Sequence, residues 1–465
     1  MTSNTTLLMK ALTMVASVLG ILAPISAQNL IADDRDDRIR ALEQRVEQLE
    51  KLLKELAPKP VPPAELPRAV DAPKPLPAVS IGASGFSMRS ADNNFVLRLR
   101  GLLQVDSRWS DDDAINDTFL IRRARPILEG TVYRDFDFRF TPEFGTSTPT
   151  IRDAWLNYRY NDALELRLGK MKPPGSLERW QAVANILFIE RGLPSLLWPV
   201  RDVGLMFHGD LWADAEDTTK SLGAAGLVNY ELGLFNGTGD GRAAGNSDFD
   251  NDKSFEGRLF FHPFLKTGTA PLQKLGLGVT GSYGEREGNP GLPDEFGYDG
   301  DVTADGLLWR VGPQAYWYWG PFGLLGEYSI SSQRLEREIA PFASTRAENH
   351  AWHVTASWLL TGEDATFRAV APRKNFDAHN GGWGAFQLVA RYAYLDIDDG
   401  LFPTFADPGE LPTRVANWGV GLNWYLNRNI RAAFNYNHFD FKGGQSGAIE
   451  DLGEHVFSTR VQLAF

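Results

Sequence analysis

The chain has 465 residues, 43% of them hydrophobic, and a formal net charge of -12 at pH 7. This charge argues against nucleic acid as a partner, and the lack of cysteine excludes disulfides and thiolate metal sites. No run of 18 or more apolar residues occurs, so a membrane-spanning helix is excluded and any spanning segment has to be a strand.

Residues 1–27 have the pattern of a cleavable secretory signal peptide. Lys10 precedes an apolar stretch over 11–22, and small residues follow up to Ala27. The stretch is too short to cross a bilayer and stops at Pro24. We therefore expect the chain to be exported.

Residues 28–57 are predicted to form a short periplasmic coiled-coil helix. The apolar residues at spacings of three and four are Ile39, Leu42, Val46, Leu49, Leu53 and Leu56. This seam favours association when a larger trimer holds three copies together, and a solvated monomeric helix is the alternative. Proline-rich residues 58–84 predict an extended linker to the next domain.

From 85 to 465 the chain repeats segments of about ten residues that alternate between apolar and polar, which predicts an outer-membrane β-barrel. We expect sixteen antiparallel strands: 93–108, 118–133, 135–145, 150–161, 163–170, 202–212, 221–235, 253–264, 273–286, 303–319, 322–334, 347–361, 383–398, 411–426, 429–442 and 452–465. An even count puts both barrel ends on the periplasmic side. Segment 362–382 then falls among the short periplasmic turns and is too long for that pattern, so either the turn is unusual or the count slips there.

Side-chain alternation predicts which residues face lipid and which face the lumen. In the first strand Leu97, Leu99 and Leu103 would face lipid, and Arg98, Arg100 and Gln104 the lumen. In the second strand Leu120 and Leu128 would face lipid, and Arg123 and Arg125 the lumen. Arg122 has the wrong parity for the lumen, so it lies near a rim or follows a β-bulge. The lumen is expected to be wet and charged.

The connection over 171–201 is the third on the long-loop side and is too apolar for a solvated loop. We expect it to fold into the barrel, where its aromatic and aliphatic residues find cover. Its basic residues are Lys170, Lys172, Arg179, Arg191 and Arg201, against Glu178 and Glu190. Arginine binds phosphate oxygens bidentately and keeps its charge, which favours an anion constriction. Pairing of the arginines with lumen acids such as Asp106, Glu129, Asp137, Asp153 and Glu165 would instead give a general porin.

Several motifs resemble those of one known family. They are Phe86 to Asp106, Ile121-Arg-Arg-Ala-Arg-Pro-Ile-Leu-Glu-Gly130, Phe136-Asp-Phe-Arg139, Asp153-Ala-Trp, Gly169 to Arg179 and Phe188 to Pro194. From about 85 to 465 the chain resembles the phosphate-selective porin O and P family. The resemblance implies a homotrimer of 16-stranded barrels in the bacterial outer membrane, with an inward third loop and an arginine ladder.

The resemblance also implies roles for single residues. Arg122, Arg123 and Arg191 match the central arginines of the family, Arg98 or Arg100 the arginine of the first strand, and Asp153 the carboxylate beside the constriction. Pro174 replaces a phenylalanine of the family, and the coil before the barrel is an addition. The expected solutes are phosphate, polyphosphate or similar small anions.

No cofactor, metal or enzymatic activity is predicted. The seven histidines lack metal-site spacing, and no nucleophile motif occurs. Asp248, Asp250 and Asp252 fit a solvated acidic loop better than a cation bridge to lipopolysaccharide. Two alternatives stay open, an outer-membrane hydrolase and a structural tether whose coil grips the cell wall. Lipid and lipopolysaccharide are expected around the barrel.

Overall fold

The computed structural model describes residues 40, 42–51, 76–111, 116–213, 226–237, 246–248, 251–290, 297–409, 411–443 and 452–465. The chain divides into two units, Met1–Pro73 and Lys74–Phe465. In the first unit residues 42–51 are helical, within the predicted coil. The predicted signal peptide lies outside the described residues. Within those residues, no helix is long and apolar enough to cross a membrane.

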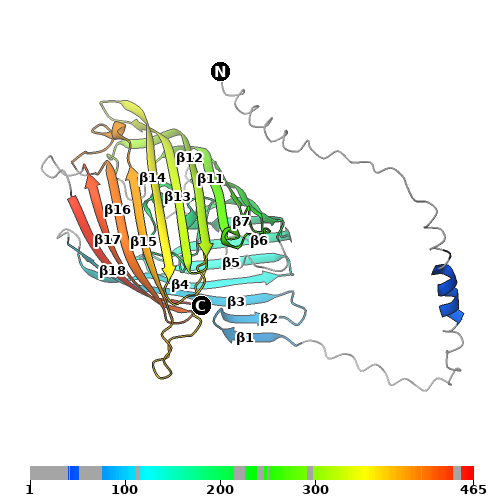
Figure 1. Ribbon diagram of the computed structural model, residues 1–465. Helices are drawn as coiled ribbons and strands as arrows, with labels where there is room; N and C mark the ends of the chain where they lie inside the picture. The colour runs from blue at the N-terminus through cyan, green and yellow to red at the C-terminus, as the bar shows by residue number, and fades with distance from the viewer. Residues whose placement is uncertain are drawn as a thin grey trace. The chain divides into compact units, whose positions relative to one another are not determined.

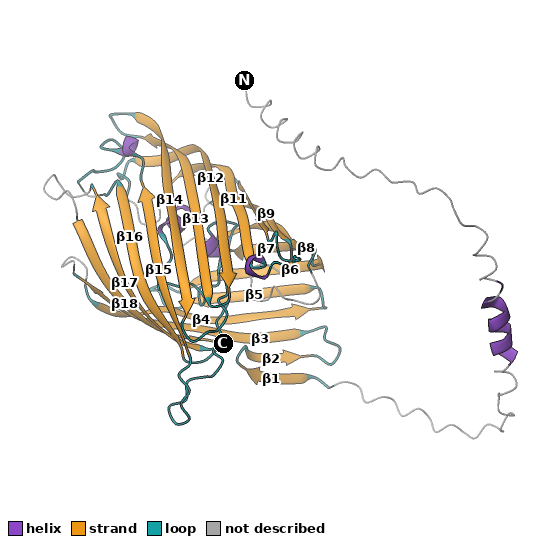
Figure 2. Ribbon diagram, in the orientation of Figure 1, coloured by secondary structure: helices purple, strands orange, loops and turns teal. Residues whose placement is uncertain are grey.

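The second unit is a closed antiparallel barrel with few helices (Figures 1 and 2). Its sixteen strands are β3 (Val96–Ser110), β4 (Thr118–Val132), β5 (Phe136–Glu143), β6 (Thr150–Asn161), β7 (Leu164–Met171), β8 (Asp202–Leu211), β9 (Val228–Phe235), β10 (Ser254–Phe261), β11 (Leu275–Gly288), β12 (Val302–Trp319), β13 (Phe322–Arg337), β14 (Ala343–Leu359), β15 (Ala385–Asp396), β16 (Arg414–Tyr425), β17 (Ile430–Lys442) and β18 (Leu452–Ala464). The short helices are α3 (Leu177–Trp180), η1 (Leu193–Leu197), η2 (Ala270–Leu272) and η3 (Asp399–Leu401). The predicted fold class and strand count are confirmed.

The barrel is apolar outside and polar inside, because alternation along each strand sends successive side chains to opposite faces. On β18, Val461 and Leu463 are exposed, whereas Arg460 and Gln462 are buried. The described residues therefore bury many polar and charged side chains and expose many large apolar ones. This distribution suits a wall between lipid and a polar bore.

The barrel closes where β18 pairs with β3, from Val456 opposite Ser110 to Ala464 opposite Leu102. Across this seam Arg460 donates to both oxygens of Asp106, at 2.7 Å each, and both side chains are fully buried. A bidentate pair of this kind fixes the register of the two strands. The first and last strands are thus joined by a buried ion pair as well as by backbone hydrogen bonds.

A β-bulge re-aims the arginines of β4. The pairing of β3 with β4 skips from Gln104–Arg123 to Val105–Ile121, so Arg122 is the extra residue and both arginines turn inward. Of the two alternatives predicted for Arg122, a position near a rim or a β-bulge, the strand pairing shows the bulge. The prediction for Leu120 was wrong, because the bulge shifts the alternation and pairs Leu120 with Asp106 of the inner face.

A hairpin that the sequence analysis missed extends the wall. Its strands are β1 (Ala78–Gly82) and β2 (Gly85–Arg89), and β2 pairs with β3 from Val96 to Leu99. Gly101 and Phe465 exchange backbone hydrogen bonds of 3.0 Å, so β2 continues the line of β18 past its end. β1 lies inside the range predicted as linker, so the barrel unit begins before residue 85. The short alternating run after the last linker proline was too brief to stand out as a strand.

The two ends of the barrel differ. At one end, which we call the N/C end, β3 begins and β18 ends. This end also has three turns of two or three residues, 133–135, 162–163 and 320–321. The other, the loop end, carries the connection 172–201. The connection 360–384 lies at the N/C end and projects beyond the strands near the C-terminus (Figure 1). The sixteen-strand count therefore holds, and this turn is simply long.

The seam pair gives a test of barrel stability. We expect Asp106→Asn to lower the free energy of unfolding by about 3–5 kcal/mol, because it removes the charge of the carboxylate that binds the buried Arg460 guanidinium on both oxygens and leaves only the more distant Glu190, at 3.7 Å, as an ion-pair partner. Asp440→Asn is the matched control, since Asp440 is exposed on β17 and bonds only to His438 among the described residues. Denaturant unfolding followed by the gel mobility of the folded barrel measures both. Equal stability of the two variants would contradict the role of the pair.

Candidate anion-binding site in the barrel bore

Segment 172–201 is held by side chains from the inner faces of the last strands. Its backbone oxygens accept hydrogen bonds as follows: Ala184 from Gln462 at 3.0 Å, Ile186 from Arg431 at 2.8 Å, Leu187 from Asn423 at 2.9 Å, Ile189 from Arg460 at 2.7 Å and Glu190 from Arg391 at 3.0 Å. The Ile189 N–H donates to Asn435 at 2.7 Å. An irregular segment without its own ladder needs such partners for its buried backbone groups. Six hydrogen bonds thereby fix the backbone of the segment between Ala184 and Glu190.

A second anchor lies where the segment begins. Glu327 of β13 accepts from Ser176 Oγ at 2.8 Å and from the Leu177 N–H at 2.6 Å, at the N-terminus of α3. Glu178 accepts from the Gly192 N–H and from Arg391, both at 2.5 Å. The Glu327 carboxylate also accepts from His353 Nε2 at 3.2 Å. Buried carboxylates with these partners keep the segment against β13–β15.

The same cluster has the composition of a metal site. Ligand atoms of Glu178, Glu327 and His353 lie within 4.8 Å of one another. Each carboxylate is already engaged by N–H or O–H donors, so a metal would bind only by displacing bonds that hold α3. The geometry fits an anchor better than a metal centre. In the predicted acidic loop, Asp248 pairs with Lys253 at 2.5 Å, and Asp250 lies outside the described residues.

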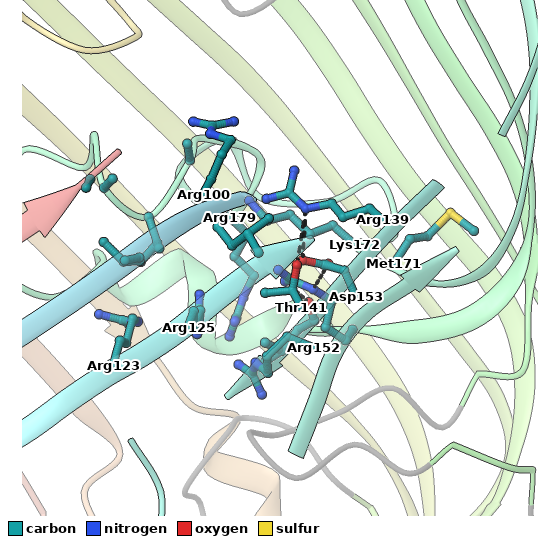
Figure 3. A pocket seen from close by; sticks show the side chains of 18 of the residues that line it. Arg100, Arg123, Arg125, Arg139, Thr141, Arg152, Asp153, Met171, Lys172 and Arg179 are labelled. Carbon is teal, nitrogen blue, oxygen red and sulfur yellow. Dashed lines mark hydrogen bonds and ion pairs between the residues drawn. The ribbon is translucent and has the colours of Figure 1, made fainter. Parts of the chain in front are cut away.

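Between the segment and strands β3–β7 lies a cavity of about 350 Å³, which we call the central cavity (Figure 3). Its basic lining residues are Arg100, Arg123, Arg125, Arg139, Arg152, Arg167, Lys172, Arg179, Arg191 and Arg201. Asp153 is the one acidic lining residue. Ten cationic side chains against one carboxylate give a local formal charge of plus nine, opposite in sign to the whole chain.

Some of these cations are neutralised by carboxylates. Arg201 donates to Asp153 at 2.7 Å, and Arg139 lies 3.8 Å from the other oxygen of Asp153. Arg125 pairs with Glu143 at 2.5 Å. Arg100 and Arg139 both approach Glu129, which stands behind the lining residues. These pairs hold their guanidinium groups in fixed positions.

Others are held by neutral groups. Lys172 Nζ donates to the carbonyls of Trp180 and Gln181 at 3.3 and 3.0 Å. Arg191 Nε donates to the Glu178 carbonyl at 2.9 Å, and Arg179 Nε to the Ser195 carbonyl at 2.6 Å. Arg167 stacks on Trp155 at 4.4 Å. A carbonyl positions a cation without cancelling its charge, so this side of the cavity stays strongly positive.

Burial changes the protonation of two of these groups. It lowers the pKa of Lys172 well below its usual value, and the nearby Arg201 and Arg191 act in the same direction. Burial, with Arg179 alongside, lowers the pKa of Arg191 to about 9. Crowding of like charges in a buried place is costly unless an anion shares it. A negative ligand in the cavity would reduce this repulsion.

Seven of the ten residues predicted for the site line the central cavity. They are Arg100, Arg123, Asp153, Lys172, Arg179, Arg191 and Arg201. Arg98 is exposed and outside the lining. Arg122 binds Glu190 at 2.7 Å, and Lys170 donates to Asn246 at 2.9 Å, both outside the lining.

Four lining arginines were not among the predicted site residues. Alternation already predicted that Arg125 faces the lumen, and Arg139 and Arg167 have lumen parity on their strands as well, so alternation alone could have found them. Arg152 does not. The pairing of β5 with β6 skips from Thr141–Asp153 to Pro142–Ile151, so Arg152 is the extra residue of a bulge. A bulge of this kind leaves no reliable mark in a single sequence.

A closed sixteen-stranded barrel with an apolar outer face and a charged bore defines the porin class of outer-membrane channels. The chain belongs to the phosphate-selective porin O and P family, whose model matches residues 98–465. A comparison with curated proteins found no match.

Solved porin structures share the fold. OmpT, an outer membrane protein of Vibrio cholerae in its trimer form, is 12% identical over 80% of this chain and 99% of its own, with a TM-score of 0.50. The outer membrane channel DcaP of Acinetobacter baumannii is 11% identical over 81% and 99%, with a TM-score of 0.51. An anion-selective porin from Comamonas acidovorans is 12% identical over 80% and 100%, with a TM-score of 0.50. At these identities the similarity shows the fold alone.

The lowered pKa of Lys172 predicts a pH dependence. A base with a lowered pKa loses its charge at a lower pH than a free lysine, so the anion preference should fall with rising pH while a free lysine is still charged. In Lys172→Arg this early loss of charge is removed, so the preference should stay level until the pH approaches the lowered pKa of Arg191, about 9. The reversal potential in a salt gradient at each pH measures the effect. The same decline in both proteins would show that another group titrates.

Proposed function

We propose that this protein is an outer-membrane channel for passive, anion-selective diffusion of phosphate or similar small anions, including polyphosphate. Segment 172–201 narrows the bore, and the central cavity binds the passing anion. The observation that carries the proposal is the ten-to-one excess of cationic over acidic lining residues. Three of the cationic residues, Lys172, Arg179 and Arg191, donate hydrogen bonds to backbone carbonyls. Asp153 tunes affinity by repelling the anion, which helps it leave.

The arrangement of the cavities supports stepwise passage. A cavity of about 400 Å³ contains Arg108, Glu190, Arg191 and Arg391, and it shares Arg191 with the central cavity. A third cavity, at the N/C end, shares Arg100 with the central one. Several moderate sites in series let an ion enter, move on and leave. Arg191 and Arg100 would pass the anion between them.

A general porin is the second candidate, and specific pairs favour it. Glu190 lies within ion-pair distance of Arg108, Arg122, Arg123 and Arg460, and Asp106 binds Arg460 and Arg108. These pairs neutralise part of the bore, as the pairing alternative expects. They do not reach Lys172 or Arg191, which have no carboxylate at ion-pair distance among the described residues. The anion-selective reading is therefore the better supported.

The hydrolase alternative has one matching constellation. His353 Nδ1 lies 3.1 Å from Thr355 Oγ1, and its Nε2 lies 3.2 Å from Glu327. All three residues are buried, and Thr355 Oγ1 also accepts from Arg391 at 3.1 Å. A hydroxyl enclosed in this way has no room for a substrate. The family and the fold also suggest a channel rather than an enzyme.

We further propose that three copies assemble, with lipid and lipopolysaccharide around the trimer and residues 28–57 in the periplasm. The OmpT structure is of a trimer form, and Leu42, Val46 and Leu49 are exposed on the helix of residues 42–51. An exposed apolar stripe at this spacing is what a coiled coil buries.

The anion proposal is tested in a planar bilayer under a potassium chloride gradient. We expect strong anion selectivity and block of the chloride current by millimolar phosphate. Arg191→Gln should weaken the block about tenfold, the factor for losing one charge-assisted hydrogen bond. Arg334→Gln is the control, because Arg334 is exposed and pairs with Glu336 away from the cavities. Cation selectivity, or no effect of phosphate on the wild type, would leave the general porin.

Deletion of residues 28–57 tests the coil. We expect single-channel conductance to stay unchanged and the trimer to dissociate at a lower temperature, because only the association of the helices is lost. Chemical crosslinking before and after heating measures the assembly. Unchanged trimer stability with lost attachment to the cell wall would instead support the tether.

A further inference from the structure

The third cavity, which we call the mouth cavity, lies at the N/C end and has a volume of about 200 Å³. Four arginines line it, Arg100, Arg368, Arg428 and Arg431. None of its lining side chains is acidic. It also shares Ala182 and Ala184 with the central cavity, so the two cavities lie next to each other along segment 172–201. An anion leaving the central cavity would next meet this set of cations.

The long connection 360–384 places Arg368 at this cavity. Phe367 and Val370 are buried in a cluster that includes Leu177 of α3 and Tyr316 of β12. The Phe367 carbonyl accepts from Gln181 Nε2 at 2.7 Å, and the Ala365 N–H donates to Gly320 at 2.7 Å. These contacts tie the connection to the same segment that bounds the central cavity. Its length, which breaks the pattern of short turns at this end, thus has a structural use.

Arg431 supplies an independent sign of a missing ligand. Its side chain is only 2% exposed, and Nη1 donates to the Ile186 carbonyl at 2.8 Å. Its Nε and Nη2 are buried and make no hydrogen bond of good geometry among the described residues, where the Tyr425 ring lies 5.9 Å from the guanidinium, and Arg100 Nε also makes none. Buried charged donors without partners are costly, and an oxyanion in the cavity would satisfy them.

We propose that the mouth cavity is a second oxyanion site, in series with the central cavity, that binds phosphate or a similar small oxyanion on the N/C side. The proposal rests on anion passage through the central cavity and adds a separate stage to it. Arg100, which lines both cavities, transfers the anion between them. Arg431 and Arg368 bind it from the wall and from the long connection.

The absence of cysteine allows a direct test. Arg368→Cys gives a single thiol, and a methanethiosulfonate that carries an ethylammonium group restores a positive charge there. In a planar bilayer, the side of faster modification identifies the N/C end. With phosphate added on that side, the concentration for half-block of the chloride current should rise about tenfold in the variant and return after modification.

Arg373→Cys is the matched control, because Arg373 is exposed on the same connection and does not line the cavity. Its half-blocking concentration should equal that of the wild type. If the wild type is blocked by phosphate and Arg368→Cys is blocked equally, the mouth site is refuted while the central site stands. If phosphate fails to block the wild type, the proposed function itself is refuted. Equal gel mobility of the folded trimers confirms that both variants assemble.

Discussion

The structure of the bore depends on one constraint, the need of segment 172–201 for hydrogen-bond partners. The segment is too apolar for water and too irregular to satisfy its own backbone. The inner faces of β15–β18 supply donors from Arg391, Asn423, Arg431, Arg460 and Gln462. These side chains are long and polar because a barrel interior of this width has to be filled from the wall. The positions of the central and mouth cavities follow from where the segment is held.

The same constraint separates two kinds of cation. Arginines that pair with Asp106, Glu129, Glu143 or Glu190 are neutralised, and they fix strand register or the segment. Lys172, Arg179 and Arg191 on the segment donate to its own carbonyls, which orient these cations without adding a counter-charge. The net charge of -12 therefore says little about the pore, because the acids that produce it lie mostly elsewhere. Local partners decide which ion the bore attracts.

Much of this was predictable from the sequence, because alternation with a period of two marks both the strands and their faces. All sixteen strands were found, and the wrong parity of Arg122 already pointed to a bulge. The bulge at Arg152 was missed, because a single arginine beside Asp153 does not show which way it turns. The hairpin β1–β2 was missed because its strands have only five residues each. Arg98 and Lys170 do not line the central cavity, because parity gives the face of a strand and not the depth along the bore.

Pairing and anion passage, the two readings that the sequence left open, are compatible once the pairs are located. Glu190 lies on the segment itself and collects arginines from β3, β4 and β18, so it joins the segment to the barrel seam. Burial raises the cost of its charge, yet these arginines hold the pKa of Glu190 far below its usual value. A carboxylate bound so firmly is a structural counter-ion, and an entering anion does not easily displace it from its arginines. The acids of the bore thus keep the arginine array rigid, and the carbonyl-held cations provide the charge that an anion meets.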